Sequence, residues 1–587
     1  MGAELPPLIP PVKRFDATGG LYLLPKGALT LTCFGGELPV RGLELLRHAR
    51  HAPLHVQQRP GSALAITLGA PDAELLPPAP PEGSPEAYAI ALLPRGIAAS
   101  ARTPVGLFRA CGTLAQLLTA ESLPCGTLHD APDRAIRGLM LDVSRNRTYS
   151  LATLFRVVDA LVQLKANRLE LYFENVFAYR GHPTIWANTS PYTAGDLMAL
   201  SHYCAERFIT LVPNQNTLGH FERWFRADPT YLRYAECPAG GVRTPWGSIQ
   251  KTPTGLRTAD PETTHFLDGL LEELLPCFPH AETANLGGDE VFDLGLGRSA
   301  GAGDKASLYL GHYAHLAATA RRFGKAPALW ADMFLRHPDM LPRAKDALPD
   351  AQWILWGYEA TDPLAAQAET LAQAGLDFLV APGSSSWRSF CGRTDNMLAN
   401  IRAAAALPTR GLLLTDWGDA GHWQPLAITL PPTVLALSLA WQSHVEPDLP
   451  AACDALAHCR GLGNFLLALG KTYLTAGANA PNATKLFQAY NLPRGQGPAL
   501  DPEALARTLV ALEALAEQGE ALGQGLLARE ARFALQLQRL ATQRALGHQN
   551  LHRARAKLAA QLQLLWLERG PVAQLEASLA DFLAPEL

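Results

Sequence analysis

Two adjacent carboxylates are the strongest chemical signal in the sequence. Asp289 and Glu290 follow two glycines in the run NLGGDE. Two carboxyl groups so close together are difficult to ionise at once, so the pKa of one should rise until it can act as a general acid near neutral pH. A lone acidic pair is common on protein surfaces, but a pair that closes a buried strand beside small glycines is far more informative. We therefore take Asp289 and Glu290 as the candidate catalytic residues.

The pair ends one of a series of short apolar runs that read as buried strands. Helical segments separate these runs, for example at 151–166 and 194–207. Eight buried strands alternating with helices over roughly 300 residues predict a (β/α)8 barrel. An open, doubly wound sheet explains eight strands less economically, and no GxGxxG motif follows the first strand. The expected strands cover residues 137–143, 168–174, 208–214, 283–289, 326–332, 352–358, 377–383 and 410–416.

Polar and aromatic residues gather where these expected strands end. In a barrel of this kind the chemistry lies where strands run into the following loops. About half of the eleven tryptophans lie at or near such ends, whereas packing alone would bury apolar residues in mid-strand. The sequence thus predicts a cleft at this rim. Its candidate lining residues are Asp142, Glu174, Asn214, Trp330, Asp332, Trp356, Tyr358, Trp387, Asp416, Trp417 and Asp419.

The expected barrel is flanked by two segments of different character. Residues 1–130 alternate strand-like and helical runs with turns and predict a small α+β domain. Its strands are expected within 21–34 and 86–101, its helices within 43–52 and 107–118, and a solvent loop at 71–86. The barrel then occupies 131–450, and a helical region occupies 451–587.

The last region contains a stretch without proline between Pro502 and Pro571, rich in Ala, Leu, Gln, Glu and Arg. This composition predicts a long helical segment over 502–568. Its apolar face must pack on the barrel or on a second copy of the chain, which would make a homodimer. Because the heptad pattern is not strict, packing on the barrel is favoured. The face contains Leu509, Leu512, Leu515 and Leu522.

Bulk properties exclude several classes of partner and cofactor. A net charge of −4 gives no basic face for nucleic acid, and no uncharged apolar run of 18 residues or signal peptide is present. Nine scattered cysteines without CxxC spacing indicate reduced thiols and a cytoplasmic location. The 17 histidines show no HxH or HExxH pairing, which disfavours a metal site. We therefore expect no cofactor, no metal and no membrane contact.

Several motifs resemble one known family. LGGDEVFDLG, at 286–295, resembles the catalytic motif of glycoside hydrolase family 20, the β-N-acetylhexosaminidases. Residues 88–118 resemble the end of the α+β domain that precedes the barrel in that family, and RGLMLDVSRNR, at 137–147, resembles its first barrel strand. The pieces FENVFAYRG, NQNTLGH and DEVFDLG are similar to the hexosaminidase D-like branch. Beyond about residue 450 the resemblance has no specificity.

The resemblance implies exo-hydrolysis of terminal β-linked GlcNAc or GalNAc from small carbohydrate substrates, by a retaining mechanism in which the substrate assists. The 2-acetamido oxygen of the sugar attacks its own anomeric carbon and forms an oxazolinium ion. Glu290 would protonate the leaving oxygen and later activate water. Asp289 would bind the acetamido N–H and stabilise the developing positive charge.

The same resemblance assigns substrate-binding roles. Arg137 and the pair Asp416 and Asp419 would hold sugar hydroxyls, and Tyr358 would donate to the acetamido oxygen. His220 would support the acid, and Asp332 would bind the sugar or position other groups. Each assignment has a structural alternative: an ion pair for Arg137, packing for the tryptophans and a buried hydrogen bond for His220. The walls of the acetamido pocket would be Trp330, Trp356 and Trp417.

The sequence departs from the family at two positions. Asn285 stands where many members have a histidine before the glycines, and Asn175 stands where the second strand often ends in an acidic residue. The histidine–aspartate relay that tunes the acid is therefore incomplete. Either Glu174 substitutes for the missing carboxylate or the site suits another sugar.

Two other readings compete with the hexosaminidase. One is a β-glucosidase or β-galactosidase of the same barrel, which would need a carboxylate nucleophile from Glu174, Asp416 or Asp419, about 5–5.5 Å from the acid. The other is a non-catalytic sugar-binding protein that keeps the aromatic cleft. The intact Asp289–Glu290 pair argues against the second reading.

Overall fold

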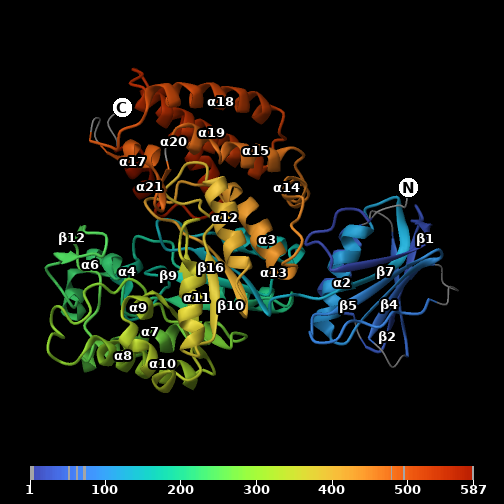
Figure 1. Cartoon of the computed structure of the whole chain (residues 1–587), viewed down its shortest axis with the longest axis horizontal. Helices are drawn as coiled ribbons and strands as arrows, with labels where there is room; N and C mark the ends of the chain where they lie inside the picture. Colours follow the sequence, from blue (N-terminus) through green and yellow to red (C-terminus); the bar gives the residue numbers. More distant parts are fainter. Residues whose placement is uncertain are drawn as a thin grey trace.

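A computed structural model describes residues 5–36, 38–49, 53–60, 64–69, 75–477, 479–492 and 496–584. Figure 1 shows a barrel with a sheet domain on one side of it and a group of helices above it. This arrangement confirms the predicted fold class of a barrel between an α+β domain and a helical region. In the part of the chain described, no helix is long and apolar enough to cross a membrane.

The first domain is a seven-stranded sheet in the order β1-β7-β5-β6-β4-β2-β3. Helices α1 (Val40–His48) and α2 (Pro104–Leu117) pack against each other beside it. α2 begins at Pro104 because the Thr103 side chain accepts a hydrogen bond from the Gly106 N–H. Of the predicted loop, residues 71–74 lie outside the described residues. The strands are β1 (Arg14–Leu23), β2 (Leu29–Phe34), β3 (Leu54–Arg59), β4 (Ala65–Gly69), β5 (Tyr88–Leu93), β6 (Gly96–Ala101) and β7 (Ser122–Asp130).

The middle of the chain forms a closed barrel of parallel strands, ordered β10-β13-β14-β15-β16-β17-β8-β9. The eight predicted strands are the strands of this barrel. They are β8 (Ile136–Asp142), β9 (Arg168–Phe173), β10 (Thr210–Gln215), β13 (Thr283–Asn285), β14 (Ala326–Trp330), β15 (Gln352–Gly357), β16 (Phe378–Pro382) and β17 (Gly411–Asp416).

Helices surround the barrel, and a small hairpin extends from it. The predicted helices at 151–166 and 194–207 correspond to α3 and α5. The hairpin consists of β11 (Val242–Arg243) and β12 (Ile249–Gln250). The helices are α3 (Leu151–Gln163), α4 (Pro183–Trp186), α5 (Ala194–Ala205), α6 (Glu222–Ala227), α7 (Pro261–Leu274), α8 (Lys305–Arg322), α9 (Asp332–Arg336), α10 (Leu341–Ala347), α11 (Leu364–Gln373), α12 (Thr394–Ala405) and α13 (Leu430–Trp441).

A buried ion cluster joins the first domain to the amino end of the barrel. Glu86 accepts hydrogen bonds from Arg109 at 2.8 Å and from Arg137 at 2.5 Å. Burial would raise the pKa of Glu86, but the two guanidinium groups hold it at about 2. Because removing one partner of a buried pair costs about 3–5 kcal/mol, this cluster fixes the domain against the barrel base.

The helical region differs from the single long segment that the sequence predicted. Three helices cover residues 502–569, and glycines interrupt them: Gly523 and Gly525 lie between the first two, and Gly547 has a φ of +79° before the third. The region contains α14 (Leu449–Ala457), α15 (Leu462–Leu469), α16 (Thr472–Thr475), β18 (Asn479–Ala480), β19 (Ala483–Thr484), α17 (Lys485–Asn491), α18 (Pro502–Glu520), α19 (Leu526–Ala545), α20 (His552–Arg569) and α21 (Leu575–Leu583).

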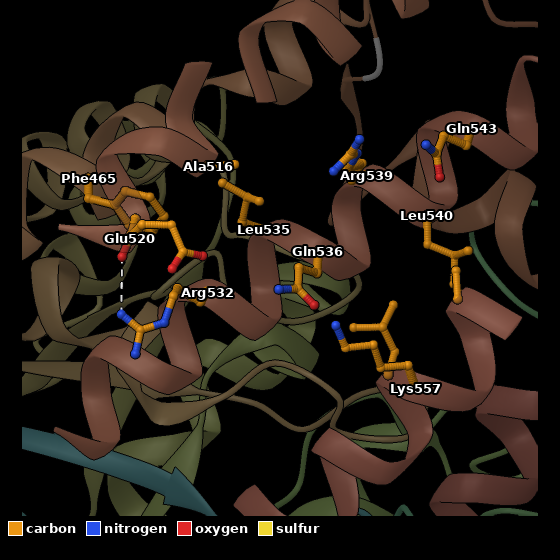
Figure 2. Close-up of a pocket in the computed structure, with 13 residues that line it drawn as sticks. Phe465, Ala516, Glu520, Arg532, Leu535, Gln536, Arg539, Leu540, Gln543 and Lys557 are labelled. Atoms are coloured by element: carbon orange, nitrogen blue, oxygen red, sulfur yellow. Dashed lines mark hydrogen bonds between the residues drawn. The ribbon is translucent and has the colours of Figure 1, made fainter. Parts of the chain in front are cut away.

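The apolar face of α18 packs inside this helical region. Leu512 and Leu515 are buried in one core with Phe465 of α15, and the same core reaches Ala427 beside the last barrel strand. A cavity of about 370 Å³ remains among α18, α19 and α20, and Figure 2 shows the side chains that line it. The α18 face therefore packs mainly on α15, α16 and α19, and not on the barrel as the sequence favoured; the core that these helices share reaches the barrel at Ala427.

Candidate active site

A glycine-dependent turn presents both candidate catalytic carboxylates to one cleft. β13 ends at Asn285 rather than at residue 289, and the chain then turns through Gly287 (φ +80°), Gly288 (φ +94°) and Glu290 (φ +53°). A Cβ atom on Gly287 would collide with the Asn216 side chain. The turn thus requires glycine, and it lets adjacent residues face the same side instead of alternating as in a strand.

A histidine lies between the two carboxylates. His220 Nε2 is 3.1 Å from Asp289 Oδ2 and 3.7 Å from Glu290 Oε2. Burial would lower the pKa of His220, but the neighbouring Asp289 raises it to about 10. Burial raises the pKa of Glu290; His220 opposes this shift and Asp289 reinforces it. The arrangement therefore pairs an imidazolium with the Asp289 carboxylate and favours Glu290 as the protonated acid.

Asp332 fixes the backbone of the acid. Its Oδ2 atom accepts the Glu290 N–H at 3.1 Å, and its Oδ1 atom accepts the indole N–H of Trp356 at 3.4 Å. Burial and the nearby Asp289 raise the pKa of Asp332 to about 7. Of the two roles expected for Asp332, these contacts favour positioning of other groups.

An aromatic pocket adjoins the carboxylates. Trp356 stacks on Tyr358 with ring centroids 5.0 Å apart, and Trp387 meets Tyr358 edge-on at 5.1 Å. The Trp417 indole donates to the Tyr358 hydroxyl at 2.9 Å, and the Trp330 ring lies 5.9 Å from Trp417. The Tyr358 hydroxyl therefore accepts one hydrogen bond from Trp417, and it is also hydrogen-bonded to Thr415. The structure brings together all five aromatic residues that the sequence singled out here.

The helical region contributes to one wall of this pocket. The Trp387 indole N–H donates to Asn482 Oδ1 at 2.8 Å, from the turn between β18 and β19. The backbone N–H of Asn482 in turn donates to Glu359, and Arg393 binds the same carboxylate at 2.7 Å. The turn is thereby tied to the barrel, and Asn482 fixes the buried indole.

The guanidinium at the cleft belongs to Arg145 and not to Arg137. Arg145 Nη1 donates to Asp419 at 2.6 Å and its Nε donates to Glu174 at 3.2 Å. The same guanidinium lies over the Trp417 ring, 4.8 Å from its centroid. The predicted sugar-binding role of Arg137 is wrong, because that residue is the second of β8 and lies at the opposite end of the barrel, with no exposed surface and with Glu86 as its partner.

Glu174 is held as a carboxylate by several donors. Tyr172 donates to it at 2.9 Å, and Arg223 Nε lies 2.8 Å from its second oxygen. Burial alone would raise the pKa of Glu174, but Arg145 and Arg223 bring it below its usual value. Glu174 therefore orients the guanidinium of Arg145, and both of its oxygens are engaged.

Three predicted site residues do not reach the cleft. Asp416 is 1% exposed and accepts hydrogen bonds from three hydroxyls, those of Ser384, Ser386 and Thr429. Asn214 donates to Glu170 inside the barrel, and Asn175 donates to the Ile185 carbonyl. The predicted sugar contact of Asp416 is thus wrong, and the two asparagines serve the packing of the barrel and its loops.

The sequence reasoning missed residues beside the pair. Arg145 lies three positions beyond the end of β8, within the motif that had been quoted for Arg137. Glu222 begins α6, directly after the loop that carries His220; burial raises its pKa and His220 opposes the shift. The position of Arg145 beyond the end of a barrel strand could have identified it as a site residue. Tyr172 lies inside a strand, where no sequence signal separates a site tyrosine from packing.

A sugar could enter such a cleft with its leaving oxygen at Glu290, its hydroxyls at Arg145 and one face on the indoles. Paired carboxylates at the end of a barrel strand, beside an aromatic pocket, are typical of glycoside hydrolases.

Comparison with known protein families narrows this class of enzymes to one family. Residues 135–397 match "Glycosyl hydrolase family 20, catalytic domain", and residues 5–131 match "Glycosyl hydrolase family 20, domain 2". The chain belongs to glycosyl hydrolase family 20, which confirms the predicted family.

Individual relatives agree with this assignment. A Beta-hexosaminidase from Akkermansia muciniphila is 28% identical over 229 residues, which are 35% of this chain and 45% of that protein. Hexosaminidase D from Bos taurus is 23% identical over 310 residues, covering 49% of this chain and 85% of the relative, in agreement with the predicted D-like branch. The chitobiase from Flavobacterium johnsoniae shares the fold, with a TM-score of 0.61 and 16% identity over 97% of this chain and 98% of that one.

Proposed function

We propose that the protein is an exo-β-N-acetylhexosaminidase that releases terminal β-linked GlcNAc or GalNAc by retaining, substrate-assisted catalysis. The observation that carries this proposal is the turn that places Asp289 and Glu290 on either side of His220, beside a pocket containing the Tyr358 hydroxyl. Family membership and relatives named as hexosaminidases support the same activity.

In the proposed first step the acetamido oxygen of the substrate attacks the anomeric carbon. The Tyr358 hydroxyl donates to this oxygen and orients it within the pocket. Asp289 Oδ2 is engaged by His220, whereas the buried Oδ1 has no hydrogen-bond partner among the described residues. Oδ1 accepts the acetamido N–H, and the carboxylate stabilises the positive charge that develops as the oxazolinium ion forms.

Glu290 provides the proton. Its side chain is 29% exposed, so it reaches the cleft, and burial raises its pKa, which favours the protonated form that donates to the leaving oxygen. As a carboxylate it then removes a proton from the water that opens the oxazolinium ring. Asp332 holds its backbone during both steps.

Arg145 and Asp419 bind the hydroxyls of the terminal sugar. Asp419 is 27% exposed and bonded to Arg145, so the two present a donor and an acceptor side by side. Glu174 keeps the guanidinium in place. It thereby supplies part of the carboxylate charge that Asn175 lacks, because the charges of Arg145 and Arg223, and then that of His220, lower the pKa of Glu174.

A carboxylate nucleophile in place of the acetamido group is the alternative that must be tested. Asp416 is surrounded by hydroxyls, and Glu174 is held by two arginines, so both are poor candidates. A panel of nitrophenyl β-glycosides of GlcNAc, GalNAc, glucose and galactose separates the two mechanisms. We expect turnover of the acetamido sugars alone.

A GlcNAc-thiazoline inhibitor completes this test, because it imitates the cyclised intermediate. We expect strong inhibition of the wild-type enzyme and a large loss of affinity in Tyr358→Phe, where the hydroxyl donor is absent. Weak inhibition, together with covalent labelling of the protein by a 2-fluoro glycoside, would replace the substrate-assisted mechanism with a carboxylate nucleophile.

We also propose a cytoplasmic location and a division into domains at residues 1–130, 131–450 and 451–587. All nine cysteines are free thiols and most are buried, which supports a reducing compartment. A homodimer formed through the C-terminal helices stays a prediction. Sedimentation of the purified protein would test it.

A further inference from the structure

A deep groove lies at the junction of the barrel and the helical region. It has a volume of about 610 Å³ and is lined by α3, α13, α14 and the turn from α18 to α19. Figure 1 shows α3, α13 and α14 close together below the C-terminal helices. The residues that line the groove are distinct from those of the catalytic cleft. Small-molecule sites occupy about 300–1,000 Å³ and occur preferentially between domains, so this groove has the size and the position of a second ligand site.

The walls of the groove are apolar. Leu161 of α3 is buried, whereas Leu430 of α13, Leu456 of α14 and Leu527 of α19 are half-buried. The groove reaches the barrel itself at Leu139 of β8, which is 4% exposed. Because covering aliphatic surface removes it from water, half-buried leucines around a deep groove favour a ligand with an alkyl chain.

The arginines give the groove a positive charge. Its described lining residues include Arg156, Arg460 and Arg569 but no aspartate or glutamate. Arg569 is neutralised, because it donates to both oxygens of the buried Glu530, at 2.7 and 2.9 Å. Arg156 and Arg460 are exposed, and neither forms a hydrogen bond or a salt bridge with another residue that the structure describes. Two guanidinium groups are therefore available to an anion.

Glu568 does not take this place. Arg529 donates to both oxygens of Glu568, at 2.6 and 2.5 Å. Arg529 is also the main cause of the lowered pKa of Glu568, to which Arg156 contributes little. The carboxylate of Glu568 is thus engaged by another arginine.

The N-terminus of α19 adds to the positive potential. This helix of 20 residues follows Gly525, and within the described part of the chain no side chain caps it. Residues 526–528, in its first turn, line the groove. Unpaired N–H groups at a helix N-terminus favour anions. In a chain with a net charge of −4, this local positive potential points to an anionic ligand.

We propose that the groove binds a long-chain fatty acid, with its alkyl chain along the leucines and its carboxylate held by Arg156 and Arg460 at the rim. A guanidinium donates paired hydrogen bonds to a carboxylate. A short anion would leave the leucines in water, and an uncharged alkyl chain would leave the arginines without a partner. This second ligand site does not depend on the proposed hydrolysis of amino sugars.

Isothermal titration calorimetry of the full chain with decanoate tests this site. We expect one saturable site per chain. Octanoate should bind roughly 15-fold more weakly, because two buried CH₂ groups are lost and each is worth about fourfold in affinity. Acetate should show no binding, and 1-decanol, which has the same chain without the charge, should bind roughly tenfold more weakly than decanoate.

Three variants locate the site. The double variant Arg156→Gln/Arg460→Gln should weaken decanoate roughly tenfold and leave 1-decanol unchanged. Leu527→Asp places a carboxylate in the groove and should abolish decanoate binding. Arg553→Gln removes an exposed arginine of α20 outside the groove and should bind decanoate as the wild type does.

Circular dichroism and the thermal unfolding midpoint would verify that the variants are folded. The arginines are exposed, so the double variant keeps the test valid even where Leu527→Asp unfolds. Equal affinity for decanoate in the wild type and the double variant, or the absence of saturable binding, would overturn the proposal. A wild-type protein that sediments with phosphatidylglycerol vesicles but does not bind monomeric decanoate would also overturn it, in favour of a membrane surface.

Discussion

Replacing Asp289 by asparagine tests the electrostatic part of the mechanism most directly. The substitution keeps the size of the side chain and removes its charge, so the turn after Gly288 is retained. In the structure this charge neutralises His220 at 3.1 Å, and its free oxygen is directed to the acetamido group. Two unit charges about 4 Å apart at an effective dielectric constant of 20 interact by about 4 kcal/mol.

The expected effect on kcat and KM depends on the stage of the reaction at which the Asp289 charge stabilises the sugar. The positive charge exists in the oxazolinium-like transition state and not in the bound substrate, so its loss affects turnover more than binding. We expect kcat of Asp289→Asn to fall roughly 10²–10³-fold, the range found when one preorganised group at a reacting centre is removed. KM should change much less.

The pH profile gives a second, independent readout. Repulsion from Asp289 helps to raise the pKa of Glu290, and attraction to Asp289 raises that of His220 to about 10. Without this charge burial lowers the pKa of His220, so Glu290 loses the attraction of the imidazolium together with the repulsion of Asp289. Because His220 is the stronger of these two influences on Glu290, and Glu290 must be protonated to act as the acid, the alkaline limb of kcat/KM should move to higher pH in Asp289→Asn.

Steady-state kinetics on nitrophenyl N-acetyl-β-glucosaminide between pH 4 and about pH 9 would measure both effects. Circular dichroism and the thermal unfolding midpoint would verify that the variant is folded. An unchanged kcat with a raised KM would refute the reasoning, since Asp289 would then act as a ground-state ligand of the sugar. An alkaline limb that stays in place would refute the proposed coupling to Glu290.

Three further substitutions test the site. Glu290→Gln should lower kcat/KM on diacetylchitobiose roughly 10²–10⁴-fold and that on nitrophenyl glycosides much less, because kcat/KM reports the departure of the leaving group and a nitrophenolate leaves without a proton; equal losses of kcat/KM would contradict its role as the acid. Arg145→Lys should lower kcat/KM on GlcNAc glycosides about 10²-fold while Arg137→Lys lowers the thermal midpoint and leaves KM alone; the reverse result would return the sugar contact to Arg137. Asn482→Ala leaves the buried Trp387 N–H without its acceptor, at a cost of about 1–3 kcal/mol, so KM and the thiazoline inhibition constant should rise; unchanged values would show that the helical region does not affect the pocket.

The barrel was predictable from the sequence because its strands are short, apolar and regularly spaced. The catalytic turn was predictable in kind, since two glycines before two carboxylates allow the backbone to leave the strand. Its location was not: β13 ends at Asn285, Asn216 approaches Gly287 closely, and Asp332 accepts the N–H of Glu290, which has a φ of +53°. These contacts come from neighbouring strands, which no local pattern specifies.

The two wrong site assignments have different physical causes. Arg137 was taken from the right motif but at the wrong end of the strand, and the rule that barrel chemistry lies beyond strand ends would have selected Arg145. Asp416 does lie at a strand end, but its side chain is directed toward the hydroxyls of Ser384, Ser386 and Thr429. Adjacent side chains at a strand end point in different directions, so Trp417 lines the pocket and Asp416 does not.

The helical region was the least predictable part of the chain. Its composition indicated helix correctly, but three glycines at 523, 525 and 547 divide the segment into three helices. A glycine costs only about 1 kcal/mol within a helix, so a sequence alone does not decide whether it is tolerated or ends the helix. Here the helices end at these glycines, and Gly547 has a φ of +79°.

The bond between Trp387 and Asn482 also has a consequence for the order in which the enzyme is made. The last barrel strand ends at Asp416, but the asparagine that fixes the pocket wall follows about 65 residues later, roughly 3–13 s of synthesis at 5–20 residues per second. During that interval the barrel can close while Trp387 still lacks its partner. A nascent chain can therefore form the barrel before the wall of its pocket is fixed. A product that stops after the barrel would contain Glu290 and Arg145 but would lack the acceptor that holds Trp387.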